Sequence, residues 1–463
     1  MGNTRVEKDS MGEMEVPAEA LYGASTQRAV LNFPISGRPL PAVFIHTYGL
    51  LKAFAAETNA ALGLLDHDRA RRISAAGREI SRGKHDAHFP ADVYQTGSGT
   101  STNMNVNEVI AALCNQHPGD SVHPNDHVNL GQSSNDTFPT VMHVAAAVAL
   151  NEKLAPALAD LTAALEKKSA EFAGILKIGR THLMDATPVT LGQEFGGWAE
   201  QMRQAKRRCA SAIDALMPLA LGGTAVGTGL NTHPEFAVRT IAGLAEHYGL
   251  PFREAANHFE AQSARDACVE AHGFLQTIAV SLHKIACDIR LLASGPRCGF
   301  GELTLPATQP GSSIMPGKVN PVMAEVVTMV AARVAGNQTT VAWCGAGGFL
   351  ELNVSMPLLA DVMLESIGLL AAACSAFHDN AVAGIAANEE TCRSFIEQSL
   401  AMVTSLVPLI GYDRAAAIAK ESMATGRTVR ELCHAHAAVL DLTPGRIDEA
   451  LDAGRMAGGG PGF

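Results

Sequence analysis

Residues 259–294 read FEAQSARDACVEAHGFLQTIAVSLHKIACDIRLLAS, and this stretch decides the fold class. It contains one internal glycine and no proline. As a continuous helix it would be roughly 50 Å long at 1.5 Å per residue. Its apolar residues alternate spacings of three and four: Leu275, Ile278, Leu282, Ile285, Ile289 and Leu292. That spacing is typical of helices packed nearly parallel, so the sequence predicts a bundle of long helices.

Further long helices are predicted at 139–172, 188–217, 321–336 and 356–378, and elements of this kind assemble into a helix bundle. Alanine-rich faces on helices this long usually find partners in another subunit, so we expect an oligomer. We find no fixed-period repeat and no alternating strand runs, and nothing in the pattern supports an α/β sheet. The fold class is therefore mainly α.

The chain of 463 residues exceeds the size at which one hydrophobic core usually stops growing. We predict an N-terminal mixed, mostly helical domain at 1–133 and a central long-helix bundle domain at 134–389. A small C-terminal helical domain is predicted at 390–463, ending in a disordered glycine-rich tail.

Charge and composition exclude several classes of function. A net charge of -11 without a Lys/Arg-rich block argues against nucleic acid or an anionic membrane as a partner. The first residues contain no signal core or transit peptide, and the apolar runs stop short of a membrane helix, so we expect a cytoplasmic protein. The 9 cysteines contain no CxxC pair, which favours buried, reduced thiols over disulfides or a metal site.

The stretch GSSIMPGKVNP at 311–321 lies between two predicted helices and carries many hydrogen-bonding groups. Asn320 is expected as a helix N-cap, with Pro321 at the first helical position. Free backbone N–H groups, the helix dipole and Lys318 would together make an anion site. The glycine spacing and the residue after the lysine do not fit a phosphate-binding P-loop.

Three other segments have the same character: GSGTSTNMN at 97–105, GQSSNDTFPT at 131–140 and GRTHLMDATPVT at 179–190. In the last of these, Thr187 and Pro188 are expected at N-cap and first-turn positions. Each loop alone could simply cap a helix and satisfy turns. Capping needs one hydroxyl or amide per helix, however, and these loops supply several each. Neutral donors with one cation suit a small carboxylic acid better than a phosphate or nucleotide.

Three residues are candidates for proton transfer. His182 lies in a polar loop, and Glu325, early in the helix after 321, could orient its imidazole. Ser312 lies in a glycine-flanked loop, where Lys318 and helix dipoles favour the ionised form of a hydroxyl. No GxSxG elbow or Ser-His-Asp set favours hydrolysis.

At these residues the chain resembles the fumarase/aspartase superfamily, whose members eliminate a group β to a carboxylate to release fumarate. GSSIMPGKVNP is the superfamily signature, and TGSGTSTNMNVNEV, HPNDHVN, GRTHLMDATPVTLGQEFGGW, LALGGTAVGTGLNTHPEFA and ELNVSMP look like the class II fumarases. Aspartate ammonia-lyases typically have Gln at the position of His182 and Thr at that of Ser134. Both positions are fumarase-like here, whereas Ser101 and Thr102 do not discriminate between the two classes.

The resemblance implies reversible hydration of fumarate to L-malate by anti addition and elimination through an aci-carboxylate carbanion. Ser312 would be the base that removes the C3 proton, and His182, oriented by Glu325, would handle the water at C2. The resemblance also implies substrate contacts from Ser98, Gly99, Thr100, Ser133, Ser134, Asn135, Thr181, Ser313, Lys318, Val319 and Asn320. No metal or organic cofactor is implied. Two alternatives are an aspartate ammonia-lyase and a non-enzymatic relative like the lens crystallins of this fold.

Members of the superfamily are homotetramers with a core of long helices, and each active site uses loops from three chains. The resemblance therefore implies a three-domain fold and a homotetrameric helical core. Fumarases often have a second anion site near the HPND segment, here His123, Pro124, Asn125 and Asp126, helped by an arginine three residues before the histidine. Asp120 stands at that position in this chain, so we expect the second site to bind a dicarboxylate poorly.

Overall fold

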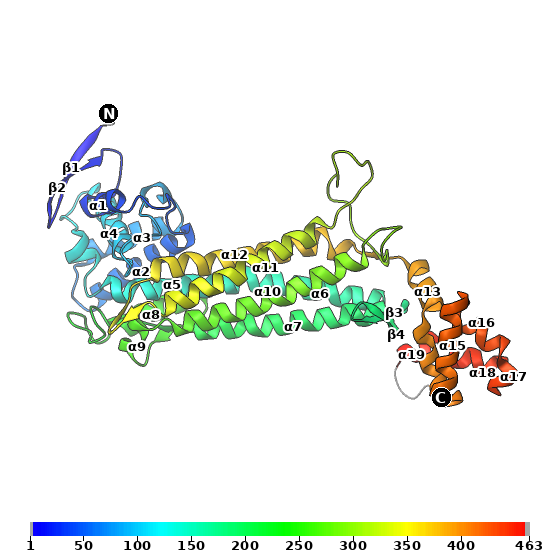
Figure 1. The fold of residues 1–463 in the computed structure, drawn as a ribbon. Coiled ribbons are helices and arrows are strands. Elements are labelled where there is room, and N and C mark those ends of the chain that lie inside the picture. Colours follow the sequence, from blue (N-terminus) through cyan, green and yellow to red (C-terminus); the bar gives the residue numbers. More distant parts are fainter. Residues whose placement is uncertain (1–2, 459–463) are drawn as a thin grey trace. The chain divides into compact units, whose positions relative to one another are not determined.

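The computed structural model describes residues 3–458, and this part of the chain is mainly helical (Figure 1). Its first elements are β1 Thr4–Asp9, β2 Gly12–Pro17, α1 Ala24–Asn32, α2 Ala42–Ala61, α3 His67–Ser81, η1 Asp86–His88, α4 Thr100–Asn115 and η2 Pro124–Val128. The mainly α fold class predicted from the sequence is confirmed.

The middle of the chain supplies the longest helices. Its elements are α5 Ser134–Ala149, η3 Leu150–Leu154, α6 Ala155–Glu171, β3 Leu176–Thr181, β4 Met184–Thr190, α7 Leu191–Ala215, β5 Pro218–Leu219, α8 Phe236–Tyr248, β6 Arg253–Glu254, α9 His258–Ser263, α10 Asp266–Leu292, β7 Leu303–Thr304, α11 Val322–Gly345, β8 Gly348–Phe349, β9 Leu352–Asn353 and α12 Met356–Asn380. Each long helix predicted from the periodicity has a counterpart among them.

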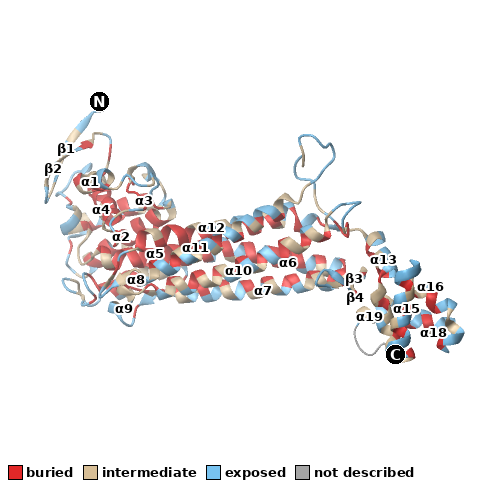
Figure 2. Ribbon diagram, viewed as in Figure 1, coloured by how far each residue is buried: buried red, intermediate tan, exposed pale blue. Residues whose placement is uncertain are grey.

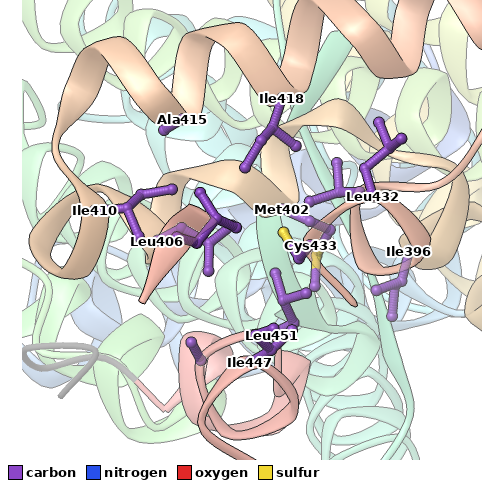
Figure 3. Close-up of a cluster of buried hydrophobic side chains, with 13 residues drawn as sticks. Ile396, Met402, Leu406, Ile410, Ala415, Ile418, Leu432, Cys433, Ile447 and Leu451 are labelled. Carbon is purple, nitrogen blue, oxygen red and sulfur yellow. The ribbon is translucent and has the colours of Figure 1, made fainter. Parts of the chain in front are cut away.

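The C-terminal part consists of short elements: η4 Val382–Gly384, β10 Ala386–Ala387, α13 Glu389–Gln398, η5 Leu400–Leu406, α14 Val407–Ile410, α15 Tyr412–Thr425, α16 Val429–Ala435, α17 Ala437–Leu440, α18 Pro444–Ala450 and α19 Ala453–Ala457. Their buried side chains form a hydrophobic cluster that includes Met402, Leu406, Ile418 and Leu432 (Figure 3). The end of the predicted glycine-rich tail, 459–463, lies outside the described residues.

The chain forms two compact units, each built from alternating stretches of sequence. Unit 1 contains the described residues up to Pro156, with Arg207–Ala279 and Ala331–Ala371. Unit 2 contains Ala157–Lys206, Val280–Val330 and the described residues from Ala372 onward. The division at 133 and 389 expected from the sequence stays a prediction.

The helix predicted at 259–294 is interrupted near its start. Ala264 has an extended backbone, with φ −95° and ψ 152°, and separates α9 from α10. The Arg265 carbonyl then accepts the first hydrogen bonds of α10, from Cys268 and Val269. The continuous helix therefore has 27 residues and is roughly 40 Å long. Its apolar seam is confirmed, since every residue from Leu275 to Leu292 named above is buried.

Two helix starts differ from the prediction. Thr187 and Pro188 lie in strand β4, and Thr190 caps α7 instead, exchanging hydrogen bonds of 2.9 and 3.1 Å with Gln193. After the loop 311–320, the Pro321 carbonyl accepts the first hydrogen bond of α11, from the Glu325 N–H. Pro321 is therefore the N-cap, one residue after the expected Asn320.

The small two-stranded sheets were not predicted from the sequence. Strands β1 and β2 pair antiparallel, with Thr4 opposite Pro17 and Asp9 opposite Gly12, and their side chains alternate between more and less exposed positions. Strands β3 and β4 form a second antiparallel pair. Every sheet in the described residues has two strands, so none forms a layer of an α/β fold.

Unit 1 packs α2 against α3, α4 and α5. Gly49 and Gly77 allow α2 and α3 to approach closely, because a Cβ on Gly77 would lie 2.5 Å from the Gly49 carbonyl oxygen. The tilted rings of Phe44 and Phe138 pack with their centroids 4.7 Å apart, which joins α2 to α5. Helices α4 and α5 are largely buried (Figure 2), so the loops at their N-termini start from fixed positions.

Helix α12 is long and apolar enough to cross a membrane by length and composition alone. However, 67% of its most apolar window is buried inside the structure, as in the core helix of a soluble protein. Of the cysteines, Cys298 is exposed and Cys287 partly exposed, whereas the others are buried as expected.

Candidate functional site

A row of hydroxyl groups in unit 1 joins two of the polar loops. The Ser98 and Thr100 hydroxyls are 2.8 Å apart, and those of Thr100 and Ser134 are 2.7 Å apart. Ser98 and Ser134 are buried, and Thr100 is partly exposed. Loops separated by more than 30 residues in the sequence therefore meet at the N-termini of α4 and α5, where backbone N–H groups favour an anion.

Gly99 is essential to this arrangement because it combines a special backbone with a close contact. Its φ of +75° lies in the left-handed region, and a Cβ would lie 2.0 Å from a ring carbon of Phe138. Only glycine therefore lets the backbone turn from Ser98 into α4 while it passes over the aromatic ring.

Ser133 and Asp136 form a capping box at the start of α5. The Ser133 hydroxyl accepts the Asn135 N–H, and the Asp136 carboxylate accepts the Ser133 N–H at 2.9 Å. The second oxygen of Asp136 accepts the N–H groups of Gly222 and Thr224, each at 3.0 Å. Burial raises the pKa of Asp136, and the N–H group of Ser133 acts against that rise.

Asp136 was not selected from the sequence as a site residue, although its spacing from Ser133 is that of a capping box. It holds the glycine-rich segment 222–229 against α5. That segment also accepts a hydrogen bond from the Asn135 side chain, through the Ala225 carbonyl at 2.8 Å. The role of segment 222–229 here is to support the start of α5.

Unit 2 presents Thr181 and His182 at the tip of the β3–β4 hairpin. The turn residues His182 and Leu183 have φ values of 56° and 62°, the left-handed pair required by a two-residue hairpin turn. Neither is a glycine, so the turn stores strain of the kind found at functional sites. His182 is exposed at this tip. The segment is thus a hairpin, and not the irregular loop expected from its composition.

Buried ion pairs anchor the base of this hairpin. Arg180 donates to the Glu302 carboxylate at 3.1 Å, and Lys177 lies 3.3 Å from the same oxygen. Lys177 also donates to Glu194 at 2.8 Å. The guanidinium of Arg180 lies over the ring of Phe300, 4.2 Å from its centroid. These contacts fix the strand that carries His182, because buried charges are costly to separate.

The loop 311–320 of unit 2 folds back on itself. Gly311 donates its N–H to the Lys318 carbonyl at 2.9 Å and accepts from the Asn320 amide at 2.6 Å. The Ser312 hydroxyl oxygen accepts the N–H groups of Ile314 and Met315, at 3.2 and 3.0 Å. Two donors on one oxygen stabilise negative charge there.

A cavity of about 410 Å³ is lined by this loop, and its lining residues include Ser312, Lys318 and Val319. Lys318 and Ser313 are exposed, as is Glu325 in the first turn of α11. Among the described residues of one chain, His182 and Glu325 share neither a hydrogen bond nor an ion pair. The expected pairing of these two residues stays a prediction.

The segment expected to form a second anion site is largely exposed and makes local contacts. His123 accepts the N–H groups of Asn125 and Asp126 through Nδ1, and Pro124 is the first residue of the π-helix η2. The Asp120 carboxylate lies 3.5 Å from Arg69. Asp120 is thus paired with an arginine from another helix, and the weak binding expected at this second site stays a prediction.

Comparison with known proteins identifies the family. A family model described as lyase matches residues 12–336, and one described as the fumarase C C-terminus matches 402–458. A class II fumarate hydratase of Corynebacterium efficiens is 52% identical over 98% of this chain and 96% of its own.

The chain belongs to the class II fumarate hydratase family. A second relative with the same name, from Methylorubrum extorquens, is 52% identical over 92% of each chain. The crystal structure of a class II fumarase from Schistosoma mansoni covers 98% of this chain and 99% of its own, with 38% identity and a TM-score of 0.94. Family membership makes this protein an enzyme of the hydro-lyase class.

Gly99→Ala should disturb the hydroxyl row without removing any of its members. The added methyl must displace Phe138 or the backbone and also strain φ, so we expect a loss of about 1–3 kcal/mol in unfolding free energy. Thermal unfolding of the purified variant measures this effect. Gly445→Ala is the control, since a Cβ there meets nothing within 4 Å. Equal midpoints for the two variants would contradict the argument.

Proposed function

We propose that this protein catalyses the reversible hydration of fumarate to L-malate. The observation that carries the proposal is the hydrogen-bonded row of Ser98, Thr100 and Ser134 at two helix N-termini, in a chain of the class II fumarate hydratase family. Hydroxyl and N–H donors arranged in this way bind a carboxylate without needing a counter-charge on every oxygen.

In the direction of dehydration, Ser312 as an alkoxide takes the C3 proton of malate. The electron pair left on C3 is delocalised into the adjacent carboxylate as an aci-carboxylate dianion, which fixed donors and Lys318 stabilise. Protonated His182 gives its proton to the C2 hydroxyl, which leaves as water as the C2–C3 double bond forms. Hydration reverses these steps, so atoms and charge balance without a further reactant.

The assignment of individual contacts follows the same logic. We assign the substrate carboxylates to Thr100, Ser133, Ser134 and Asn135 in unit 1, and to Thr181, Ser313, Lys318, Val319 and Asn320 in unit 2. The backbone N–H group of Val319 needs no side chain for this role. The short contacts within 311–320 support Ser312 as the base, because its oxygen already accepts two N–H groups.

We further propose that the protein is a homotetramer whose active sites combine loops from different subunits. Large apolar side chains remain exposed on the long helices of a single chain, among them Val280, Met329 and Trp343. Among the described residues of one chain, His182 and Glu325, expected to act as a pair, share neither a hydrogen bond nor an ion pair. A neighbouring subunit would supply what is missing in both cases. The cytoplasmic location expected from the sequence stays a prediction.

The reaction is tested by offering L-malate, L-aspartate and argininosuccinate side by side. Fumarate should form from malate, measured as the absorbance of the new double bond, because His182 and Ser134 are fumarase-like. Release of fumarate from aspartate with malate untouched would instead establish the ammonia-lyase alternative.

His182→Asn should lower malate turnover by about 10²–10⁴-fold, since a positioned general acid or base contributes that much. The tetramer should persist, as judged by light scattering, because the side chain is exposed on a hairpin tip. His117→Asn, a change at another exposed histidine, serves as the control and should retain full activity. Unchanged turnover in His182→Asn would remove the imidazole from the mechanism.

Shared active sites predict complementation between two inactive variants. Differently tagged His182→Asn and Ser312→Ala chains are unfolded together and refolded, so that hybrid tetramers form. Some sites in the hybrids then receive an intact hairpin from one chain and an intact 311–320 loop from another, and activity should reappear. Each variant refolded alone is the control. Isolated hybrids that show no activity would place both residues of each site on the same chain.

A further inference from the structure

Lys52 of helix α2 is a buried cation that the proposed chemistry does not use. Its side chain is fully buried in unit 1. The ammonium donates to three side-chain oxygens, those of Asn103 at 2.8 Å, Gln132 at 2.9 Å and Asn129 at 3.0 Å. An ammonium has three protons, so every donor of Lys52 has an acceptor.

Asn103 and Gln132 belong to the two loops that carry the hydroxyl row, and Asn129 follows η2 just before the second loop. Asn103 lies in the first turn of α4, where its N–H donates to the Gly99 carbonyl at 3.0 Å. Gln132 directly precedes Ser133, and its carbonyl accepts a hydrogen bond from Asn129 at 3.0 Å. A single ammonium thus links the start of α4 to the turn that leads into α5.

Tyr48, one helical turn before Lys52, strengthens the same link. Its hydroxyl donates to Asn103 at 3.0 Å and lies 2.7 Å from the Thr137 hydroxyl. Thr137 in turn donates to the Ser133 carbonyl at 2.7 Å. Two buried side chains of α2 therefore hold both loops.

The cost of burying a charge indicates that Lys52 has a role other than packing. Burial lowers its pKa to about 7, with the charge of Asp136 acting in the opposite direction. A buried charge with polar partners is often no more stable than well-packed apolar residues of the same volume. The lysine instead determines geometry. Its nitrogen is bound by three acceptors, and these bonds fix the relative positions of the segments that carry the acceptors.

We propose that Lys52 is a positioning residue, which sets the distance between Thr100 and Ser134 and so the geometry of the carboxylate-binding donors. The inference rests on the function proposed above and deepens it. Lys52 touches neither the proposed substrate contacts nor the proton-transfer groups, and acts only through Asn103, Asn129 and Gln132.

The test compares Lys52→Met with Lys168→Met. Lys168 is also a buried lysine, but it lies in unit 2 and donates to the Ile385 carbonyl and Glu171. Lys52→Met should lower kcat/KM for malate about 10–100-fold, mainly through KM, because displaced donors weaken binding of the carboxylates in both ground and transition states. Lys168→Met should keep the KM of the wild type, whatever its effect on stability.

Gln132→Leu keeps the lysine and removes one acceptor, so it decides the question if Lys52→Met does not fold. It should raise KM in the same direction and by a smaller factor. A folded Lys52→Met tetramer with unchanged KM, or an unchanged KM in Gln132→Leu, would overturn the proposal. A lower melting temperature alone, with KM unchanged, shows a merely structural lysine and also overturns it.

Amide hydrogen exchange separates failure of this inference from failure of the proposed function. Wild-type protein without malate or fumarate turnover would refute the function and leave the positioning of the loops still measurable. Lys52→Met should exchange faster than the wild type in 99–103 and 132–136, whereas Lys168→Met should not. Equal protection of these segments in the wild type and Lys52→Met overturns the positioning role, whatever the substrate.

Discussion

The buried carboxylate of Asp136 is the contact on which the unit 1 part of the site depends. It accepts the N–H of Ser133 on one oxygen and the N–H groups of Gly222 and Thr224 on the other. A buried carboxylate is costly unless its oxygens are satisfied, so the turn into α5 and the segment 222–229 are held to one geometry. The start of α5, and with it Ser134, therefore has little freedom to move.

In unit 2 a different buried acid, Glu302, fixes the position of a candidate site residue. Glu302 is fully buried and is approached by Lys177 and Arg180, both in strand β3. The strand ends at Thr181, so the next residue is the strained His182 at the tip. In both units a buried acid determines position, while the imidazole of His182 is exposed and the hydroxyl of Thr100 is partly exposed for chemistry. Strain at His182 is sustainable only because the strand below it is anchored.

The sequence was sufficient for features that depend on local pattern. The seam from Leu275 to Leu292 has a period that only a helix can bury on one side, and the structure buries each of its residues. Helix ends were harder, because competing caps lie close together. Two pairs could each begin a helix here, Thr187 with Pro188 and Thr190 with Gln193. Because Pro188 pairs with Ile178 across the hairpin, the helix begins after Thr190.

The residues that position the site could not be predicted from the sequence, for a different reason. Lys52 reads as an ordinary polar residue in an apolar helix, and its partners lie about 50 to 80 residues away in separate segments. No spacing rule connects them, because a contact between α2 and a loop depends on how the helices pack. The hydroxyls could be recognised since they cluster along the chain, whereas the groups that aim them are scattered. Residues that contact a ligand are thus easier to find from sequence than residues that position those contacts. The positioning residues can be identified only once the fold is known.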